Sequence, residues 1–192
     1  MPKPLITIGI ASFNAAESIK DSIYSALNQT WRPIEIVIVD DYSNDQTFEI
    51  IKNLALRNKE IRYFRNKNNY GIGFVRNKII EESKGQFLAF FDDDDLSNRN
   101  RINIQYRRII EYEMNYNSNK PIICHSSREV IYPNGRTRIR PTMGTRNDSP
   151  APAGIEVAKR ILLGKHLKDG YGSCPTCSQM ARLKTYKNIG GF

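Results

Sequence analysis

Residues 34–41 read Ile34-Glu-Ile-Val-Ile-Val-Asp-Asp41, an apolar run that ends abruptly in two carboxylates. The run is too apolar for either of its sides to face water, which is typical of a central strand in a parallel sheet. Residues 86–95, Gln86-Phe-Leu-Ala-Phe-Phe-Asp-Asp-Asp-Asp95, repeat the pattern with four carboxylates. We therefore expect buried strands over 34–39 and 86–91, each followed by acidic side chains.

The rest of the first half alternates between strand-like and helix-like segments. A further apolar run over 5–10 and a shorter segment over 61–64 predict strands, and apolar residues recur at helical spacing between the strands. The expected helices contain Ile19, Ile23 and Leu27; Phe48, Ile51 and Leu54; Phe74, Ile79 and Ile80; and residues 98–116. Such alternation predicts an α/β fold, with a doubly wound and mostly parallel sheet covered by helices on both faces.

Beyond Pro121 the pattern changes to short strand-like segments over 122–124, 130–132 and 137–139. Pro133-Asn-Gly135 is a turn signal between the last two, so we expect a small antiparallel hairpin there. Residues 142–154 are expected to form a loop and 155–163 a helix. A chain of 192 residues lies in the size range of one domain.

The composition, 40% hydrophobic and 26% charged, is that of a globular protein and excludes the disordered and collagen-like classes. No apolar run approaches the roughly 18 residues that a membrane-spanning helix needs, and no signal peptide follows Met1. Three cysteines are too few for a disulfide framework, which agrees with a reducing compartment. We expect a cytoplasmic protein.

Cys174-Pro-Thr-Cys177 has the CxxC spacing, and with Cys124 and His125 it raises the alternative of a zinc site. Zinc would bind only if the fold brought the two segments together. One CxxC pair without a second is a weak signal, so we favour thiols that are half-buried in a loop.

The net charge of +9 leaves three partner classes open: nucleic acid, an anionic membrane face and a phosphorylated ligand. The cations form no dense stripe interleaved with aromatic residues, which disfavours nucleic acid. Arg136-Thr-Arg-Ile-Arg140 is the most basic stretch. It is typical of a solvated hairpin edge or of a patch that attracts phospholipid head groups, and we favour the edge because strand edges commonly carry such charges.

Polar residues gather where the predicted strands end. Ser12 and Asn14 follow the first strand, Asp40 and Asp41 the second, and Asp92 to Asp95 the fourth. In an open α/β sheet the carboxyl ends of the strands hold the ligand. Helix capping explains a single carboxylate, but four together repel one another unless a cation neutralises them. We therefore expect a cation site at this edge.

In an extended segment Asp92 and Asp94 point to the same side, so both can approach one metal ion. Mg²⁺ or Mn²⁺ held in this way keeps positions open for substrate phosphates and acts as a Lewis acid on a leaving diphosphate. The helix start near Gly73 and the side chain of Arg76 are candidates for further positive potential there. The alternative for Arg76 is an exposed helix charge. The sequence thus predicts displacement of a nucleoside diphosphate.

Five segments in series resemble the motifs of the family 2 inverting glycosyltransferases. They are Ile8-Gly-Ile-Ala-Ser-Phe-Asn14, Asn28-Gln-Thr30, Ile36-Val-Ile-Val-Asp-Asp-Tyr-Ser-Asn-Asp45, Asn69-Tyr-Gly71 with Arg76-Asn77, and Phe91-Asp-Asp-Asp-Asp-Leu96. Each motif alone is a weak signal, but five in order over roughly the first hundred residues are specific. The resemblance implies a GT-A fold, with residues 1–116 as the nucleotide-sugar-binding half and 117–192 as an incomplete start of the acceptor half.

The resemblance also implies roles for individual residues. The nucleotide-binding residues would be Ala11, Ser12, Phe13, Asn14 and Asp41, with Phe13 stacked on the base. Asp92 and Asp94 match the DxD motif that holds the divalent cation and the diphosphate. Asp93 and Asp95 would touch ribose or sugar, and Arg76 would lie on the donor side. Cys174 and Pro175 belong to a segment, 172–182, that is similar to the one preceding the family's acceptor site.

The activity that the resemblance implies is transfer of a sugar from a nucleoside-diphosphate sugar, with UDP-sugars favoured, to a hydroxyl of a saccharide or lipid-linked acceptor. Transfer would be metal-assisted, with inversion, in polysaccharide or glycoconjugate biosynthesis, with peripheral contact to the inner face of an anionic membrane.

The family's general base is an acidic residue some way after Gly190-Gly-Phe192, where this sequence ends. The spacing of Asp148, Glu156 and Asp169 recommends none of them as a substitute. General-base catalysis contributes roughly 10² to 10⁴ in rate. We therefore expect donor binding to survive in this chain and transfer to be weak or absent.

Three other interpretations stay open. A nucleotidyltransferase would share the sheet and the metal, but Ser12-Phe-Asn-Ala15 lacks the expected glycine-rich, basic phosphate loop. A receiver-type signalling domain needs an acidic pair after the first strand, where this sequence has none. The third is a truncated, non-catalytic module that binds nucleotide sugar or a partner protein. An assay that measures binding and turnover separately distinguishes this module from an active transferase.

Overall fold

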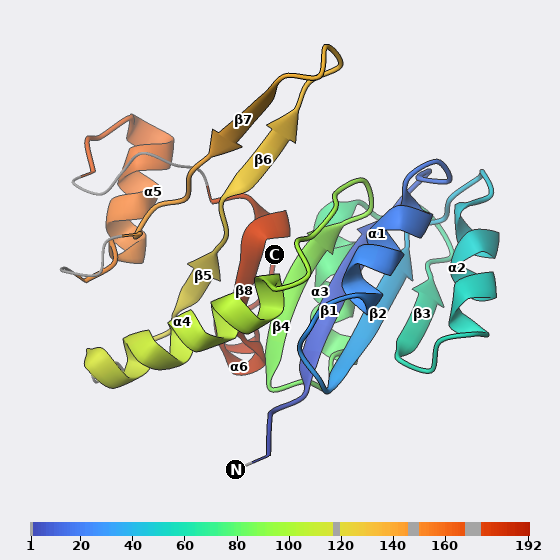
Figure 1. Ribbon diagram of the computed structural model, residues 1–192, viewed down its shortest axis with the longest axis horizontal. Helices are drawn as coiled ribbons and strands as arrows, with labels where there is room; N and C mark the ends of the chain where they lie inside the picture. The colour runs from blue at the N-terminus through green and yellow to red at the C-terminus, as the bar shows by residue number, and fades with distance from the viewer. Residues whose placement is uncertain (1, 117–119, 146–149, 168–173) are drawn as a thin grey trace.

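A computed structural model describes residues 2–116, 120–145, 150–167 and 174–192. Its centre is a six-stranded sheet with the strand order β3-β2-β1-β4-β8-β5 (Figure 1). The strands are β1 (Ile6–Ser12), β2 (Ile34–Asp40), β3 (Ile61–Arg65), β4 (Phe87–Asp92), β5 (Ile123–His125) and β8 (Gln179–Arg182). The first four are parallel, whereas β8 is antiparallel to both β4 and β5. The mostly parallel α/β sheet expected from the sequence is confirmed.

Helices cover both faces of this sheet, as expected. They are α1 (Ile19–Leu27), α2 (Thr47–Ala55), α3 (Ile72–Glu82), α4 (Arg101–Asn115) and α6 (Leu183–Asn188). One buried cluster joins α1, α2 and α4 to alternate residues of the strands, such as Ile8 and Ile38. A second cluster on the other face joins α3 and α6 to the residues between them, such as Val37 and Leu88. The alternation explains why the central strands are apolar on both sides.

Glycine allows α3 to pack closely against the centre of the sheet. A Cβ atom on Gly9 would lie 2.4 Å from the Cγ2 atom of Ile79. Ile79 is fully buried on α3, so a larger residue at position 9 would push the helix away from β1. The start of α3 is held at the strand ends by a separate contact, the hydrogen bond from the Gly71 N–H to Asp41.

The C-terminal half adds elements outside the main sheet. The hairpin expected there is confirmed as β6 (Arg128–Ile131) paired antiparallel with β7 (Thr137–Arg140), and it projects away from the sheet (Figure 1). The expected helix is α5 (Gly154–Leu163). Part of the predicted loop, 146–149, lies outside the described residues, as do Asp148 and Asp169. Within the described ranges, no helix is both long and apolar enough to span a bilayer.

Several local expectations were wrong. Strand β8, the short 3₁₀ helix Thr176–Ser178 and helix α6 were not anticipated. Helix α3 begins at Ile72, so Gly73 lies inside the helix and Gly71 is its N-cap. The side chain of Phe74 is 49% exposed instead of buried on the apolar side of that helix.

Candidate functional site

The parallel strands β1, β2 and β4 end side by side at one edge of the sheet. Ser12 pairs with Asp40, and Ala11 pairs with Asp92. The backbone N–H of Asp41 donates to the carbonyl oxygen of Ser12 over 2.8 Å. The residues predicted from the three strand ends are therefore neighbours in space.

The segment after β1 is tied to both flanking strand ends. The backbone N–H of Phe13 donates to Asp93 Oδ2 at 3.0 Å, and that of Asn14 donates to Ser43 Oγ at 2.9 Å. Asn14 has a φ of 50°, and its side-chain oxygen accepts a hydrogen bond from the backbone N–H of Asn44. The ring of Phe13 stays 47% exposed at this edge, so it is accessible for stacking against a planar ligand.

Asp41 is buried but has a largely satisfied carboxylate. It accepts hydrogen bonds from the Asn66 side chain at 2.6 Å and from the backbone N–H groups of Tyr70 and Gly71 at 3.0 and 2.7 Å. These bonds fix the loop that leads into α3. A carboxylate has about four acceptor positions, so Asp41 retains about one for a ligand donor.

The four consecutive aspartates do not form the extended segment that the sequence suggested. Strand β4 ends at Asp92, and the chain turns at Asp93 and Asp94. The expectation that Asp92 and Asp94 point to the same side because the segment is extended is therefore wrong. Instead, ligand atoms of Asp92, Asp95 and Cys177 lie within 4.8 Å of one another. Asp94 is exposed in the turn, and its role as a metal ligand stays a prediction.

Burial raises the pKa of Asp92 above its usual value, and the negative charges of Asp95 and Asp94 raise it further. The Cys177 thiol and the charge of Arg76 oppose this rise. Burial also raises the pKa of Asp93, against the hydrogen bond from the Phe13 backbone. The part of the shift that comes from neighbouring carboxylates reflects negative potential at Asp92, which a bound cation would offset.

The donor set fits a divalent cation. Two carboxylates at the end of one strand supply the hard oxygen ligands that Mg²⁺ and Mn²⁺ prefer, and Asp95 is exposed, so ligand access is open. Among the described residues, no other group of three such side chains converges.

The four-residue zinc site considered for the cysteines does not form. Cys124, Cys174 and Cys177 are free, and Cys124, His125 and Cys174 do not converge with Cys177. Cys174 and Pro175, predicted on the acceptor side, lie just before the 3₁₀ helix that carries Cys177. Burial, together with the charges of Asp92 and Asp95, raises the pKa of Cys177 to about 12. The CxxC spacing was the only sequence signal for this residue.

Arg76 lies on the site side of α3 and is also in contact with an aromatic ring. Its guanidinium carbon is 5.3 Å from the ring centroid of Phe192, and its charge acts on Asp92. The Asn77 side chain binds both the N–H and the carbonyl of Phe192. The C-terminal segment therefore packs beside Arg76 at this edge.

Tyr42 is a further aromatic side chain at this edge that the sequence patterns did not single out. It follows Asp41 directly, has a φ of 66° and is 50% exposed. The Arg65 guanidinium lies 5.4 Å from the centroid of its ring and also forms an ion pair with the buried Asp40. Tyr42 is thus a second exposed aromatic side chain on the strand edge that carries Phe13.

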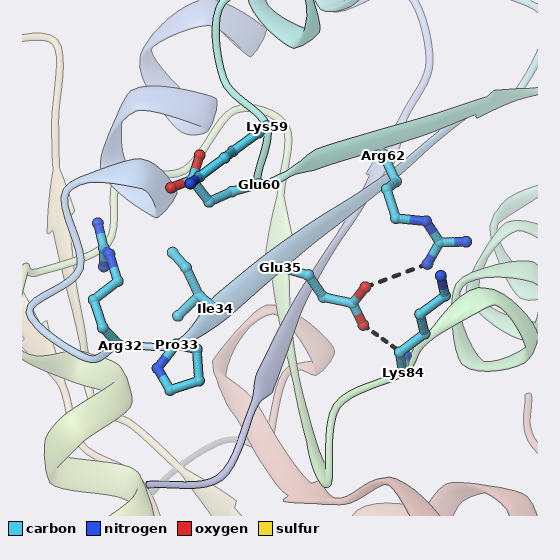
Figure 2. Close-up of a pocket in the computed structure, with 8 residues that line it drawn as sticks. All are labelled: Arg32, Pro33, Ile34, Glu35, Lys59, Glu60, Arg62 and Lys84. Carbon is cyan, nitrogen blue, oxygen red and sulfur yellow. Dashed lines mark hydrogen bonds and ion pairs between the residues drawn. The ribbon is translucent and has the colours of Figure 1, made fainter. Parts of the chain in front are cut away.

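A hollow of about 650 Å³ lies at the other end of the strands (Figure 2). It is lined by Arg32, Pro33, Ile34, Glu35, Lys59, Glu60, Arg62 and Lys84. Ile34 is the first residue of β2, whereas the aspartates follow the last residues of their strands. The hollow is therefore separate from the candidate site.

The comparisons with known proteins agree with this geometry. The sequence model described as Glycosyl transferase family 2 matches residues 7–163. An Escherichia coli relative, UDP-Glc:alpha-D-GlcNAc-diphosphoundecaprenol beta-1,3-glucosyltransferase WfaP, is 41% identical over 93 residues, which cover 47% of this chain and 36% of the relative. A Campylobacter jejuni relative, GalNAc(5)-diNAcBac-PP-undecaprenol beta-1,3-glucosyltransferase, is 32% identical over 93 residues, or 48% of this chain and 30% of the relative.

The fold is also similar to a solved structure. Staphylococcus aureus TarS superposes with a TM-score of 0.62 at 20% identity, over 96% of this chain and 29% of TarS. A TarS 1–349 complex with UDP gives a TM-score of 0.58 at 20% identity, over 96% of this chain and 48% of that one. The chain spans less than half the length of the curated relatives that it matches. Because the family match covers most of the sequence, the chain belongs to glycosyl transferase family 2.

Proposed function

We propose that the protein transfers a sugar from a nucleoside-diphosphate sugar, with a UDP-sugar favoured, to a hydroxyl group of a saccharide or lipid-linked acceptor. The observation that carries the proposal is the convergence of Asp92 and Asp95 beside Phe13 and Asp41 at the carboxyl ends of three parallel strands. The UDP complex of the TarS fold and the undecaprenol-linked substrates in the names of two relatives support the donor and acceptor classes. Polysaccharide or glycoconjugate biosynthesis is the corresponding setting.

In this proposal residues 1–116 form the donor half of the site. Phe13 stacks on the base, and Asp41 accepts a hydrogen bond from a base N–H with its remaining lone pair. Ser12 has a buried hydroxyl beside Asp93, at the edge where the donor would bind. Asp92 and Asp95 would hold Mg²⁺ or Mn²⁺, and Arg76 adds positive charge near the diphosphate. When bound, the cation supplies Lewis-acid stabilisation of the leaving diphosphate.

The proposed chemistry is a single displacement with inversion. The acceptor oxygen bonds to the anomeric carbon as the bond to the diphosphate oxygen breaks, and the acceptor hydroxyl gives its proton to a general base. Residues 117–192 would begin the acceptor half, with Cys174 and Pro175 near it. We assign the base to none of the described residues, and donor binding and sugar transfer are therefore tested separately.

Calorimetric titration of UDP with and without Mn²⁺ tests the proposal. We expect binding that requires Mn²⁺ and is lost in Asp92→Asn, with Asp21→Asn on the exposed side of α1 as a matched carboxylate control. Asp94→Ala, measured alongside, tests whether the exposed aspartate also contributes. If UDP, GDP and dTDP all fail to bind in the presence of Mn²⁺, the proposed function is wrong. Binding without turnover of UDP-sugars would instead favour the non-catalytic module.

We also propose peripheral contact with an anionic membrane. Helix α5 has no buried residue, and Ile161 and Leu162 on it are exposed together with basic Lys159. The exposed strand β7 carries Arg138 and Arg140. Amphipathic, basic elements of this kind bind anionic lipid head groups. We expect the protein to co-sediment with phosphatidylglycerol vesicles but not with phosphatidylcholine vesicles. Failure to bind phosphatidylglycerol vesicles, or equal binding to both kinds of vesicle, would refute the contact. The cytoplasmic location stays a prediction.

A further inference from the structure

Cys177 approaches the aspartates from a distant part of the chain. It precedes β8, more than 80 residues after the end of β4, and its side chain is buried, with a residue exposure of 6%. Its sulfur and one oxygen each of Asp92 and Asp95 lie within 4.8 Å of one another. The thiol therefore faces the same point in space as the two carboxylates.

The surroundings hold Cys177 in place. The hydroxyl of Ser178 donates to the carbonyl of Pro175 at 2.9 Å and lies 3.0 Å from His125 Nδ1. The carbonyl of Ser178 accepts hydrogen bonds from the Gln105 side chain at 2.9 Å and from the Ser126 backbone at 3.0 Å. A ligand fixed by its neighbours binds a metal with little reorganisation.

A half-buried cation, Arg101, lies near the cluster. The guanidinium of Arg101 donates to the carbonyl of Phe90 at 2.9 Å and lies 4.3 Å from the centroid of the Phe91 ring. Its charge acts on both Cys177 and Asp95. A positive charge at this position offsets negative charge on a sulfur ligand and on the nearby carboxylates.

We propose that Cys177 is a third protein ligand of the cation held by Asp92 and Asp95, which makes the site selective for thiophilic divalent ions. As the metal–sulfur bond forms, the thiol proton is released to solvent. Ligand atoms around a tetrahedral ion lie about 3.5 Å apart, so small rotations of the carboxylates bring the three donors together. This inference rests on the proposed function for the cation's role, but the metal site itself is tested without nucleotide.

The donor set has a direct consequence for metal choice. Mg²⁺ prefers oxygen ligands, whereas Zn²⁺ and Co²⁺ accept a thiolate together with carboxylates. The site should therefore bind Co²⁺ and Zn²⁺ more tightly than Mg²⁺. Three protein ligands also leave at least one position open for a donor phosphate oxygen.

Titration of the full, metal-free chain with Co²⁺ tests the inference, because a cobalt–thiolate bond gives a charge-transfer band in the near ultraviolet. We expect the band in the parent protein and in the control Cys174→Ser, and its loss in Cys177→Ser. Calorimetry should show Co²⁺ affinity reduced at least about tenfold in Cys177→Ser, with Mg²⁺ affinity nearly unchanged. Circular dichroism checks folding, and Cys177→Ala is a second variant with the same expected loss.

Two outcomes overturn the inference. One is Co²⁺ binding to the parent protein without a charge-transfer band, and the other is a band that persists in Cys177→Ser. Neither decides the proposed function, because Mn²⁺-dependent UDP binding is measured separately. Conversely, a band that depends on Cys177 supports the thiol ligand even if UDP fails to bind.

Discussion

The two ends of the parallel strands both carry clustered charges, but they differ in how those charges are satisfied. At the amino end, Glu35 pairs with Arg62 and accepts a hydrogen bond from the backbone N–H of Lys84 (Figure 2). It also accepts hydrogen bonds from the Thr7 hydroxyl and the backbone N–H of Gly85. At the carboxyl end, no ion pair to a described cation is formed by Asp92 or Asp95. Saturated charges serve the fold, whereas charges left unpaired beside like charges are available to a ligand.

The largest effect that this comparison predicts is on stability at the amino end. Glu35→Ala removes the acceptor of the Lys84 N–H and of the Thr7 hydroxyl and one of the two carboxylate partners of Arg62, and we expect it to lower the free energy of unfolding by about 3 kcal/mol. Denaturant unfolding measures this. Glu60→Ala in the same hollow is the control, because its side chain makes no hydrogen bond to a described residue. UDP binding should stay unchanged in the folded fraction of Glu35→Ala, and a specific loss of affinity would break the comparison.

An effect of similar size is expected on the pH dependence of stability, and it comes from His125. Burial lowers the pKa of His125 from 6.5 to about 4, with the charge of Arg101 acting in the same direction. Below pH 6.5 the unfolded chain takes up a proton that the folded chain does not, so stability falls until about pH 4. The loss is at most about 3 kcal/mol. His125→Gln should flatten this part of the stability profile, whereas His166→Gln should not; parallel profiles for all three proteins would contradict the assignment.

Asp92→Asn should separate binding from stability. We expect Mn²⁺-dependent UDP affinity to fall at least about 100-fold, because one of the carboxylate ligands is lost. The melting temperature of the metal-free protein should not fall, since the substitution removes repulsion from Asp94 and Asp95. A marked drop in melting temperature without any change in affinity would show that Asp92 belongs with Glu35 as a structural carboxylate.

Phe13→Ala sharpens the same contrast with a smaller effect. Loss of stacking on the base should weaken UDP binding about tenfold, because stacking on an aromatic side chain contributes about 1–3 kcal/mol per base. Stability should change little because the ring is 47% exposed. Tyr24→Ala, with a similarly exposed ring on α1, is the matched control in the same calorimetric titration.

The smallest effect is expected at the rim of the amino-end hollow. Lys59 is exposed, so Lys59→Ala should alter stability by less than about 0.5 kcal/mol and leave UDP affinity unchanged. Chemical denaturation and calorimetry check both quantities. Weakened UDP binding in Lys59→Ala would mean that the two ends of the sheet are coupled.

The sequence predicted the parallel part of the fold because each of its strands is an apolar run followed by polar residues. Strand β8 escaped prediction because only Met180 and Ala181 are apolar in it, and its position depends on pairing with β4 and β5. The position of the aspartates at one edge of the sheet was predictable because they directly follow apolar runs. The grouping of Asp95 with Cys177 was not, because it depends on a turn after Asp92 and on a contact between segments far apart in sequence.

Glu35 and Arg76 also show that contacts between distant segments could not be predicted from local sequence patterns. The second strand was expected to be buried on both sides although it contains Glu35, and the pattern did not show how that charge is accommodated. Glu35 is buried because backbone and side-chain donors from distant segments satisfy its carboxylate. Arg76 was expected to act on the diphosphate, and its contact with the ring of Phe192 had no signal in local spacing. Local patterns predict elements and strand ends, whereas partners of buried charges require the assembled chain.

The position of β8 also has a consequence for how the protein is made. A ribosome releases β1 to β4 well before residues 179–182, so the outer edge of β4 has no neighbour while the intervening residues are made. An open strand edge is a template for intermolecular pairing, which makes the nascent chain a candidate for chaperone capture until β8 emerges. Because Cys177 lies two residues before β8, insertion of that strand covers the edge of β4 and brings the sulfur to the aspartates in the same event.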